Sequence, residues 1–97
     1  MPKAYWITVY RAIKDPAKLA AYAKLAPPAL APFGAKYLCR GSPAATFEAG
    51  ENQRVVVTEF PSVEKAVAGH DSPGYQAALK ALGDGAVRDI RIVEGLE

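Results

Sequence analysis

Four strand-like stretches, many of them rich in aromatic and β-branched residues, are separated at two places by helical patterns, and this order restricts the fold more than any other feature of the sequence. Side chains in a strand alternate between two faces, whereas those in a helix recur every three or four positions, so the two kinds of segment differ in period. The first stretch contains neither glycine nor proline, as is typical of a strand. The predicted strands are residues 4–13, 35–40, 53–60 and 87–95.

The first helical pattern follows Asp15, a residue type that caps helices well, and it starts with Pro16, which fits the first helical position. Pro27 and Pro28 interrupt the pattern, because each lacks an amide donor and crowds the preceding turn. We therefore expect a kink or a restart of the helix before Gly34 ends it.

The second helical pattern has two candidate starts. Ser62 is a predicted N-cap after the third strand, and Ser72 with Pro73 restarts the pattern before it ends at residues 83–85. His70, the only histidine, lies near the end of the first of these segments, on the face expected to turn toward the sheet. Residues 41–52 are rich in Gly, Pro and Ala, which predicts a hairpin excursion with a short extension around 46–48.

Together these segments predict an α+β fold of β-α-β-β-α-β order, the split unit of ferredoxin-like folds, with a four-stranded antiparallel sheet. A chain of 97 residues has apolar material for a single core, so residues 1–97 are expected to form one domain.

Both faces of the predicted sheet carry large apolar side chains, whereas the helices can cover only one face. Leaving the second face in water would be costly, so we expect a homodimer whose sheets pack face to face. One face is predicted to hold Ile7, Val9, Val55, Val57, Ile90 and Ile92, and the other Trp6, Tyr10, Val56, Phe60 and Val93, with Thr8, Thr58 and Arg91 between them.

Charge and cysteine content exclude several classes of protein. Twelve basic and ten acidic residues give a net charge of +2, and no run of adjacent basic residues occurs, so a nucleic-acid partner is not expected. Cys39 is the only cysteine and has apolar neighbours, which predicts a buried thiol in a reducing compartment. The N-terminal residues match neither a signal peptide nor a membrane span, so we expect a cytoplasmic protein without a membrane partner.

Several motifs in this order resemble the Domain of Unknown Function 1330 family across nearly the whole chain. They are "AYWITVYRAIKDP", "YLCRG", "RVVVTEFPSVEKAVAGHDSPGYQAAL" and "IRIVEG". The resemblance implies a ferredoxin-like subunit that forms a dimeric α/β barrel, and it implies no known reaction.

The wider group of dimeric α/β barrels includes antibiotic biosynthesis monooxygenases, some of which carry a histidine in a segment that "AVAGHDSP" resembles. This resemblance, with the neutral range in which histidine titrates, makes His70 the candidate catalytic acid or base. The alternative is a structural helix-end residue that donates a hydrogen bond to a carbonyl or to Asp71. In the closer family an aromatic residue is expected at this position.

The other candidate site residues are arginines, a glutamate and aromatic side chains that could contact a small molecule. Arg40 could hold a carboxylate or phenolate, or could pair with Glu59. Arg54 and Glu59 flank an apolar strand, where they could act in a site or form an ion pair. The predicted aromatic contacts, which could equally be core residues, are Trp6, Tyr10, Tyr37 and Tyr75.

No cofactor is expected from these residues. One histidine and one cysteine cannot complete a zinc site, so no metal is predicted. A haem with His70 as its axial ligand is supported only by analogy of fold.

The sequence therefore predicts a protein of uncertain enzymatic status that binds a small aromatic or anionic organic molecule in each subunit. One alternative is a cofactor-independent monooxygenase or isomerase with His70 as acid or base, and another is a structural or interaction module without a ligand.

Overall fold

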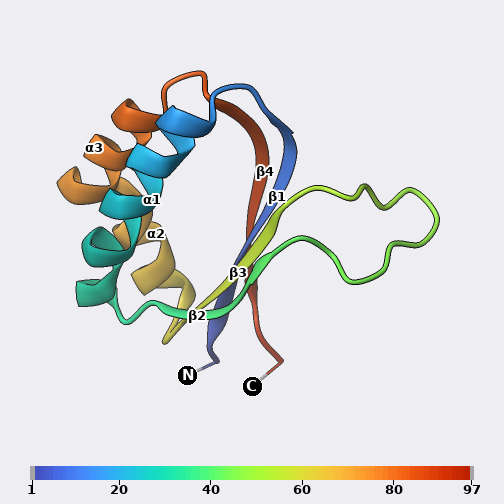
Figure 1. The fold of residues 1–97 in the computed structure, drawn as a ribbon. Helices are drawn as coiled ribbons and strands as arrows, with labels where there is room; N and C mark the ends of the chain where they lie inside the picture. Colours follow the sequence, from blue (N-terminus) through green and yellow to red (C-terminus); the bar gives the residue numbers. More distant parts are fainter. Residues whose placement is uncertain (1, 97) are drawn as a thin grey trace.

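The computed structural model describes residues 2–96 as a four-stranded antiparallel sheet with its helices on one side (Figure 1). The predicted β-α-β-β-α-β order is confirmed, with the second helical region divided into two helices. The elements are β1 (Ala4–Ile13), α1 (Pro16–Leu30), the 3-10 helix η1 (Ala31–Phe33), β2 (Lys36–Gly41), β3 (Val55–Phe60), α2 (Val63–Asp71), α3 (Pro73–Leu82) and β4 (Ala86–Glu94).

The strands lie in the order β2-β3-β1-β4, and each neighbouring pair is antiparallel. β1 is therefore central, with Trp6 opposite Thr58 on β3 and opposite Ile92 on β4. Register shifts between Tyr10 and Ala12 in β1, and again in β2, indicate bulges that change the alternation of side chains.

Three polar side chains start the helices where the sequence predicts. Asp15 accepts hydrogen bonds from the backbone N–H groups of residues 17 and 18, and Ser62 accepts one from that of residue 65. Ser72 ends α2 and begins α3, because its Oγ donates to the Gly69 carbonyl at 2.7 Å and accepts from the Tyr75 N–H at 3.3 Å. These side chains satisfy groups that helix ends leave without partners.

The helix does not restart at its prolines, which was one of the two outcomes expected from the sequence. α1 continues through Pro27 and Pro28 to Leu30, and a short 3-10 turn then leads to Gly34, which adopts a left-handed backbone. The residues four positions before the prolines, 23 and 24, are exposed, so water can solvate the carbonyls that the prolines leave without a donor.

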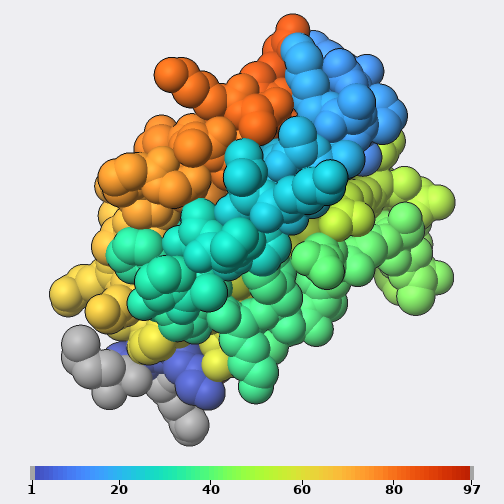
Figure 2. Space-filling model, turned by 60° about the vertical axis from the view of Figure 1, so that its left-hand side comes forward, coloured from blue at the N-terminus to red at the C-terminus, as the bar shows by residue number. Residues whose placement is uncertain are grey.

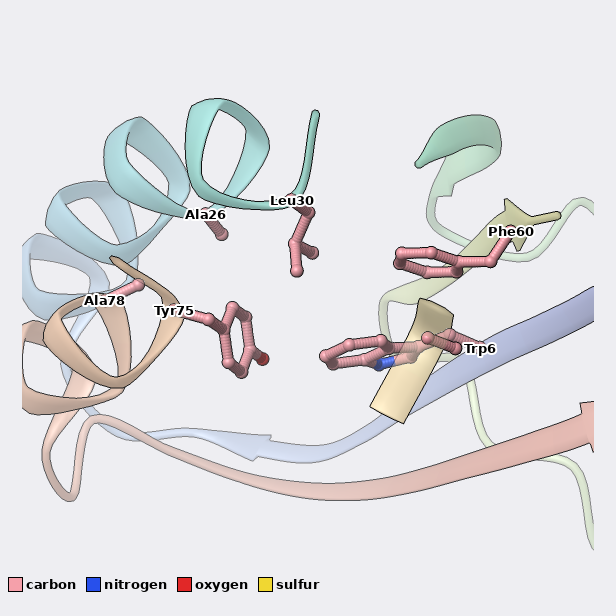
Figure 3. Close-up of a cluster of buried hydrophobic side chains, with 7 residues drawn as sticks. Trp6, Ala26, Leu30, Phe60, Tyr75 and Ala78 are labelled. Atoms are coloured by element: carbon pink, nitrogen blue, oxygen red, sulfur yellow. The ribbon is translucent and has the colours of Figure 1, made fainter. Parts of the chain in front are cut away.

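The core lies between the sheet and the helices. Trp6 and Phe60 stack with ring centroids 5.8 Å apart, and Tyr75 meets the Trp6 indole edge-on at 5.1 Å. Figure 3 shows these rings pointing from the strands and α3 into the space beneath α1. The buried cluster comprises Trp6, Ala26, Leu30, Phe60, Ala66, Tyr75 and Ala78.

The predicted faces of β4 are reversed. Ile90 and Ile92 lie opposite Thr8 and Trp6, so they share the helix-covered face, whereas Arg91 and Val93 lie on the other face. The prediction was wrong because a strand's alternation gives its two faces but not its register with the neighbouring strand.

The second face of the sheet is not covered by helices (Figure 1). Among its apolar side chains, Val9 is 39% exposed and Val93 is 50% exposed. The uncovered face therefore carries apolar side chains, as expected, although β4 contributes Val93 rather than Ile90 and Ile92.

Residues 42–54 form a loop that extends away from the rest of the chain (Figure 1). Residues 46–48 contain no strand, so the short extension predicted there is wrong. Cys39 is exposed in the single chain, which corrects the predicted buried thiol, because the bulge in β2 turns Cys39 toward the uncovered face opposite Val57. Within the described residues, no helix has the length and apolar character needed to cross a membrane.

Candidate functional site

A pocket opens between α1 and the helix-covered face of the sheet. In Figure 2, α1 (cyan to teal) runs between α3 (orange) and the green segment that contains β2 and the following loop. The empty space in and around the pocket is about 470 Å³, a volume that includes the open solvent in front of it. Its lining includes Trp6, Thr8, Tyr10, Tyr22, Tyr37, Arg40, Arg54, Thr58 and Arg88.

The arrangement of the strands places two arginines on either side of Tyr10. Arg88 on β4 lies opposite Tyr10, and Arg54, just before β3, accepts a backbone hydrogen bond from Tyr10 on the other side. The guanidinium carbons of Arg54 and Arg88 lie 6.0 and 5.7 Å from the centre of the Tyr10 ring. The sheet therefore positions both cations against one aromatic side chain.

Two further tyrosines hold the pocket arginines. Arg88 lies 4.6 Å from the centre of the Tyr22 ring, and Arg40 lies 5.3 Å from the centre of the Tyr37 ring. Tyr22 belongs to α1 and Tyr37 to β2, so these contacts hold Arg88 and Arg40 at different sides of the pocket.

The pocket arginines lack carboxylate partners, in contrast to those on the uncovered face. Arg11 and Arg91 both form ion pairs with Asp89, at 3.2 and 3.1 Å. Across residues 2–96, no ion pair involves a pocket arginine, and no Asp or Glu lines the pocket. The chain thus balances the arginines of one face and leaves those of the other without a countercharge.

The Arg54 side chain also contains a buried nitrogen that lacks a hydrogen-bond partner. Its Nε is buried and has no hydrogen-bond partner, and it is the only such side-chain nitrogen or oxygen in the part of the chain described. A buried donor without an acceptor is costly, and most buried polar groups in proteins are paired. A carboxylate in the pocket could accept from this guanidinium through two parallel bonds.

The phenol groups of Tyr37, in the pocket, and Tyr75, behind it, remain neutral at physiological pH. Burial raises the pKa of Tyr37, and burial together with the neighbouring Tyr22 raises the pKa of Tyr75. Burial lowers the pKa of Arg88, but the adjacent Tyr22 and Tyr75 outweigh burial and raise it overall, so Arg88 is a cation. The pocket therefore offers cations and neutral hydroxyl groups rather than a general base.

His70 lies outside the pocket lining, at the C-terminal end of α2. Its ring packs against Trp6 and Tyr75, with centroids 5.7 and 5.3 Å away, and its side chain is 39% exposed. Its Nδ1 is 3.0 Å from Asp71 Oδ1, the contact that the structural alternative for this histidine expects. Trp6 packs against His70 and also lines the pocket, whereas His70 itself does not line it.

The structure brings together five of the predicted ligand-binding residues and separates the other two. Glu59 lies on the uncovered face and pairs with Lys3 at 3.2 Å, not with Arg40. Tyr75 is fully buried behind the pocket and shares a 2.7 Å hydrogen bond with Tyr22. The residues gathered in the pocket are Trp6, Tyr10, Tyr37, Arg40 and Arg54.

Arg88 and Tyr22 are pocket residues that sequence reasoning did not select. Arg88 precedes Ile90 and Ile92 at two-residue spacing, so it shares their face of the strand. That spacing could have identified Arg88 once the isoleucines were assigned to the helix-covered face. Tyr22 follows Leu19, another pocket residue, by three positions, so the helical period could have placed both on the inner side of α1.

The described residues contain no group of three or more His, Cys, Asp or Glu side chains positioned to hold a metal ion. The polar part of the pocket consists of guanidinium and hydroxyl groups, which suit an anion rather than a cation.

Comparison with solved structures assigns the fold to the ferredoxin-like proteins. A protein of unknown function from Rhodopseudomonas palustris, RPA0582, aligns with a TM-score of 0.76 at 19% identity, covering 99% of this chain and 84% of that one. A dimeric ferredoxin-like protein of unknown function from Thermobifida fusca gives 0.65 at 22% identity, covering 96% and 91%. SnoaB, a cofactor-independent oxygenase from Streptomyces nogalater, gives 0.69 at 9% identity, covering 100% and 96%.

The chain belongs to the family described as domain of unknown function (DUF1330), which its sequence matches over residues 3–96. The resemblance seen in its motifs is thereby confirmed. No curated protein sequence matches the chain.

Proposed function

We propose that this protein binds a small anionic aromatic molecule in the pocket beneath α1. The observation that carries the proposal is the contrast between arginines: Arg11 and Arg91 share Asp89, whereas the three pocket arginines have no carboxylate partner within residues 2–96. An anionic ligand would supply the missing countercharge, and the Trp6 and Tyr10 rings would pack against its apolar part.

The binding unit is proposed to be a homodimer formed through the uncovered face of the sheet. Apolar side chains such as Val9 and Val93 lie partly exposed there, and burying a large apolar side chain contributes about 1.5–3 kcal/mol. The similar structure from Thermobifida fusca is a dimer, which supports this arrangement.

Isothermal titration calorimetry with benzoate and benzyl alcohol tests the ligand proposal. Benzoate is expected to bind, and the neutral alcohol, which has a similar ring, is expected to bind at least about tenfold more weakly, because a charged hydrogen-bonded pair is lost. Arg54→Gln should weaken benzoate by a similar factor.

The matched control is Lys24→Gln, which removes one positive charge from an exposed position of α1 outside the pocket lining. Its affinity for benzoate should equal that of the unmodified chain. Equal affinities for benzoate and benzyl alcohol would contradict an anion site. If Arg54→Gln and Lys24→Gln lost the same amount of benzoate affinity, Arg54 would contribute only its long-range positive charge.

A cofactor-independent oxygenase or isomerase that uses His70 remains the second candidate, and the contact of the imidazole with Trp6 at the pocket wall is the observation in its favour. His70→Ala separates the two functions. A binding protein should keep its affinity for benzoate, whereas an enzyme whose acid or base is His70 should lose roughly two to four orders of magnitude in turnover of a substrate.

A further inference from the structure

The pocket arginines come from both sides of the central strand β1. Arg40 and Arg54 lie at the side of the pocket formed by β2 and β3, and Arg88 lies at the side formed by β4 and α1. We propose that the ligand of this pocket is a planar dicarboxylate, with one carboxylate at Arg40 and Arg54 and the other at Arg88. This inference rests on the proposed function and specifies its ligand class.

The sheet sets the distance between the two positions. Arg54 and Arg88 flank Tyr10 from the strands on either side of β1, so their Cα atoms are two strand spacings apart, roughly 10 Å. A single carboxylate at one position would therefore leave the other position without a countercharge unless the long arginine side chains converge.

Aromatic contacts oppose such convergence. Arg88 is held between Tyr10 and Tyr22, at 5.7 and 4.6 Å from their ring centres, and Arg40 is held against Tyr37 at 5.3 Å. Moving Arg88 to the middle of the pocket would forfeit its contact with Tyr22, and moving Arg40 there would forfeit its contact with Tyr37. A ligand with anions at both ends satisfies the arginines where they already lie.

The surface between the two positions suits a flat apolar spacer. Tyr10 lies between the backbone positions of Arg54 and Arg88, and Trp6 and Thr8 continue the same face of β1. Aromatic rings favour offset or edge contacts with other rings, so a benzene ring is a suitable spacer. The pocket thus combines two cationic ends with an aromatic wall.

The test compares benzene-1,4-dicarboxylate with its monomethyl ester by isothermal titration calorimetry. The two compounds share ring and substitution pattern, but the ester carries one carboxylate only. The diacid is expected to bind at least about tenfold more tightly, because a second charged hydrogen-bonded contact is present. Arg88→Gln should abolish this advantage, and Lys24→Gln should preserve it.

Arg88 contacts two tyrosines, so the fold of Arg88→Gln is first checked by circular dichroism. Arg40→Gln, at a more exposed position, provides a second variant, which should also reduce the preference for the diacid.

Equal binding of diacid and monoester to the unmodified chain would overturn the dicarboxylate proposal and leave the anion site intact. The proposal would also be overturned if Arg88→Gln weakened benzoate as much as the diacid, because the arginines would then converge on one carboxylate. If benzoate, the diacid and the ester all fail to bind, the proposed function fails as well.

Discussion

Tyr75 carries a polar group into the core, and its hydroxyl has one partner there. The 2.7 Å hydrogen bond to Tyr22 links α3 to the side chain that holds Arg88, so a buried residue supports the pocket without lining it. From the sequence, Tyr75 could be either a ligand-binding residue or a core residue. Which of the two applies depends on how α1 packs against α3, and the spacing of residues along the chain does not show that packing.

Stability should fall in alkaline solution because of Tyr75. An unfolded tyrosine ionises near pH 10, whereas burial raises the pKa of Tyr75 in the folded chain. Above about pH 10 the unfolded state therefore binds fewer protons than the folded state, and the free energy of unfolding decreases as pH rises. Tyr75→Phe should reduce this decrease, as measured by urea unfolding at about pH 8 and about pH 11.

Tyr5→Phe is the control for this titration, because Tyr5 lies on the opposite face of the sheet from Tyr75 and takes no part in its hydrogen bond to Tyr22. Tyr75→Phe should also cost about 1 kcal/mol near neutral pH through loss of the hydrogen bond to Tyr22. An alkaline loss of the same size in the unmodified chain and in Tyr75→Phe would show that another group is responsible.

The geometry of the Arg54 side chain is expected to matter as well as its charge. Arg54→Lys keeps one positive charge but loses the planar fork that can bind a carboxylate through two bonds. Calorimetry with benzoate should therefore show weaker binding by Arg54→Lys, about tenfold or more, if both fork bonds form. Unchanged affinity would mean that Arg54 acts only as a point charge.

At the scale of elements, local residue chemistry accounts for most of the observed boundaries. The predicted range of β1 matches the observed strand, and Asp15, Ser62 and Ser72 all cap helices as expected. The extent of β1 and the three helix caps depend on residues that are close together in the chain, so they can be predicted from a single sequence. Arg88 was missed because its face depends on the register between β1 and β4, which forms across a long stretch of chain.

Ser72 should be more important for stability than its position between two helices suggests. Its hydroxyl satisfies the carbonyl of Gly69 at the end of α2 and the N–H of Tyr75 at the start of α3. Ser72→Ala removes both contacts and should lower the free energy of unfolding by about 1–2 kcal/mol, measured by urea denaturation.

Ser42→Ala provides the comparison, because Ser42 is an exposed loop residue. It should change stability by less than about 0.5 kcal/mol. If the two substitutions proved equally mild, the hydroxyl of Ser72 would not be the link that joins α2 to α3.

For the whole molecule, the uncovered side of the sheet determines the proposed assembly. The sequence predicted that both faces carry large apolar groups, and this conclusion holds despite the reversal of β4, because Val93 and Val87 take the places assigned to the isoleucines. The pocket, in contrast, depends on where α1 lies relative to the sheet, so its residues could be proposed one by one but not as one set.

The proposed dimer predicts different effects for two valines of similar exposure. Val9 lies on the uncovered face and is 39% exposed, whereas Val67 lies on α2 and is 44% exposed. Val9→Lys should produce a monomer in size-exclusion chromatography with light scattering, because two copies of the new charge would be buried in the interface. Val67→Lys should remain a dimer.

Lysine is suitable at position 9 because the residue directly opposite Val9 on β4 is Asp89, which carries the opposite charge. If Val9→Lys is still a dimer, the interface must lie on another surface. If the unmodified protein is a monomer, the face-to-face assembly is excluded.

The position of Trp6 gives the molecule a built-in optical probe. It is the only tryptophan in the chain, and its indole borders the pocket while packing against Phe60 and Tyr75. All of the protein's indole emission therefore originates at one wall of the pocket. Occupancy of the pocket can be followed by fluorescence in the native protein, without a label and before any reaction is identified.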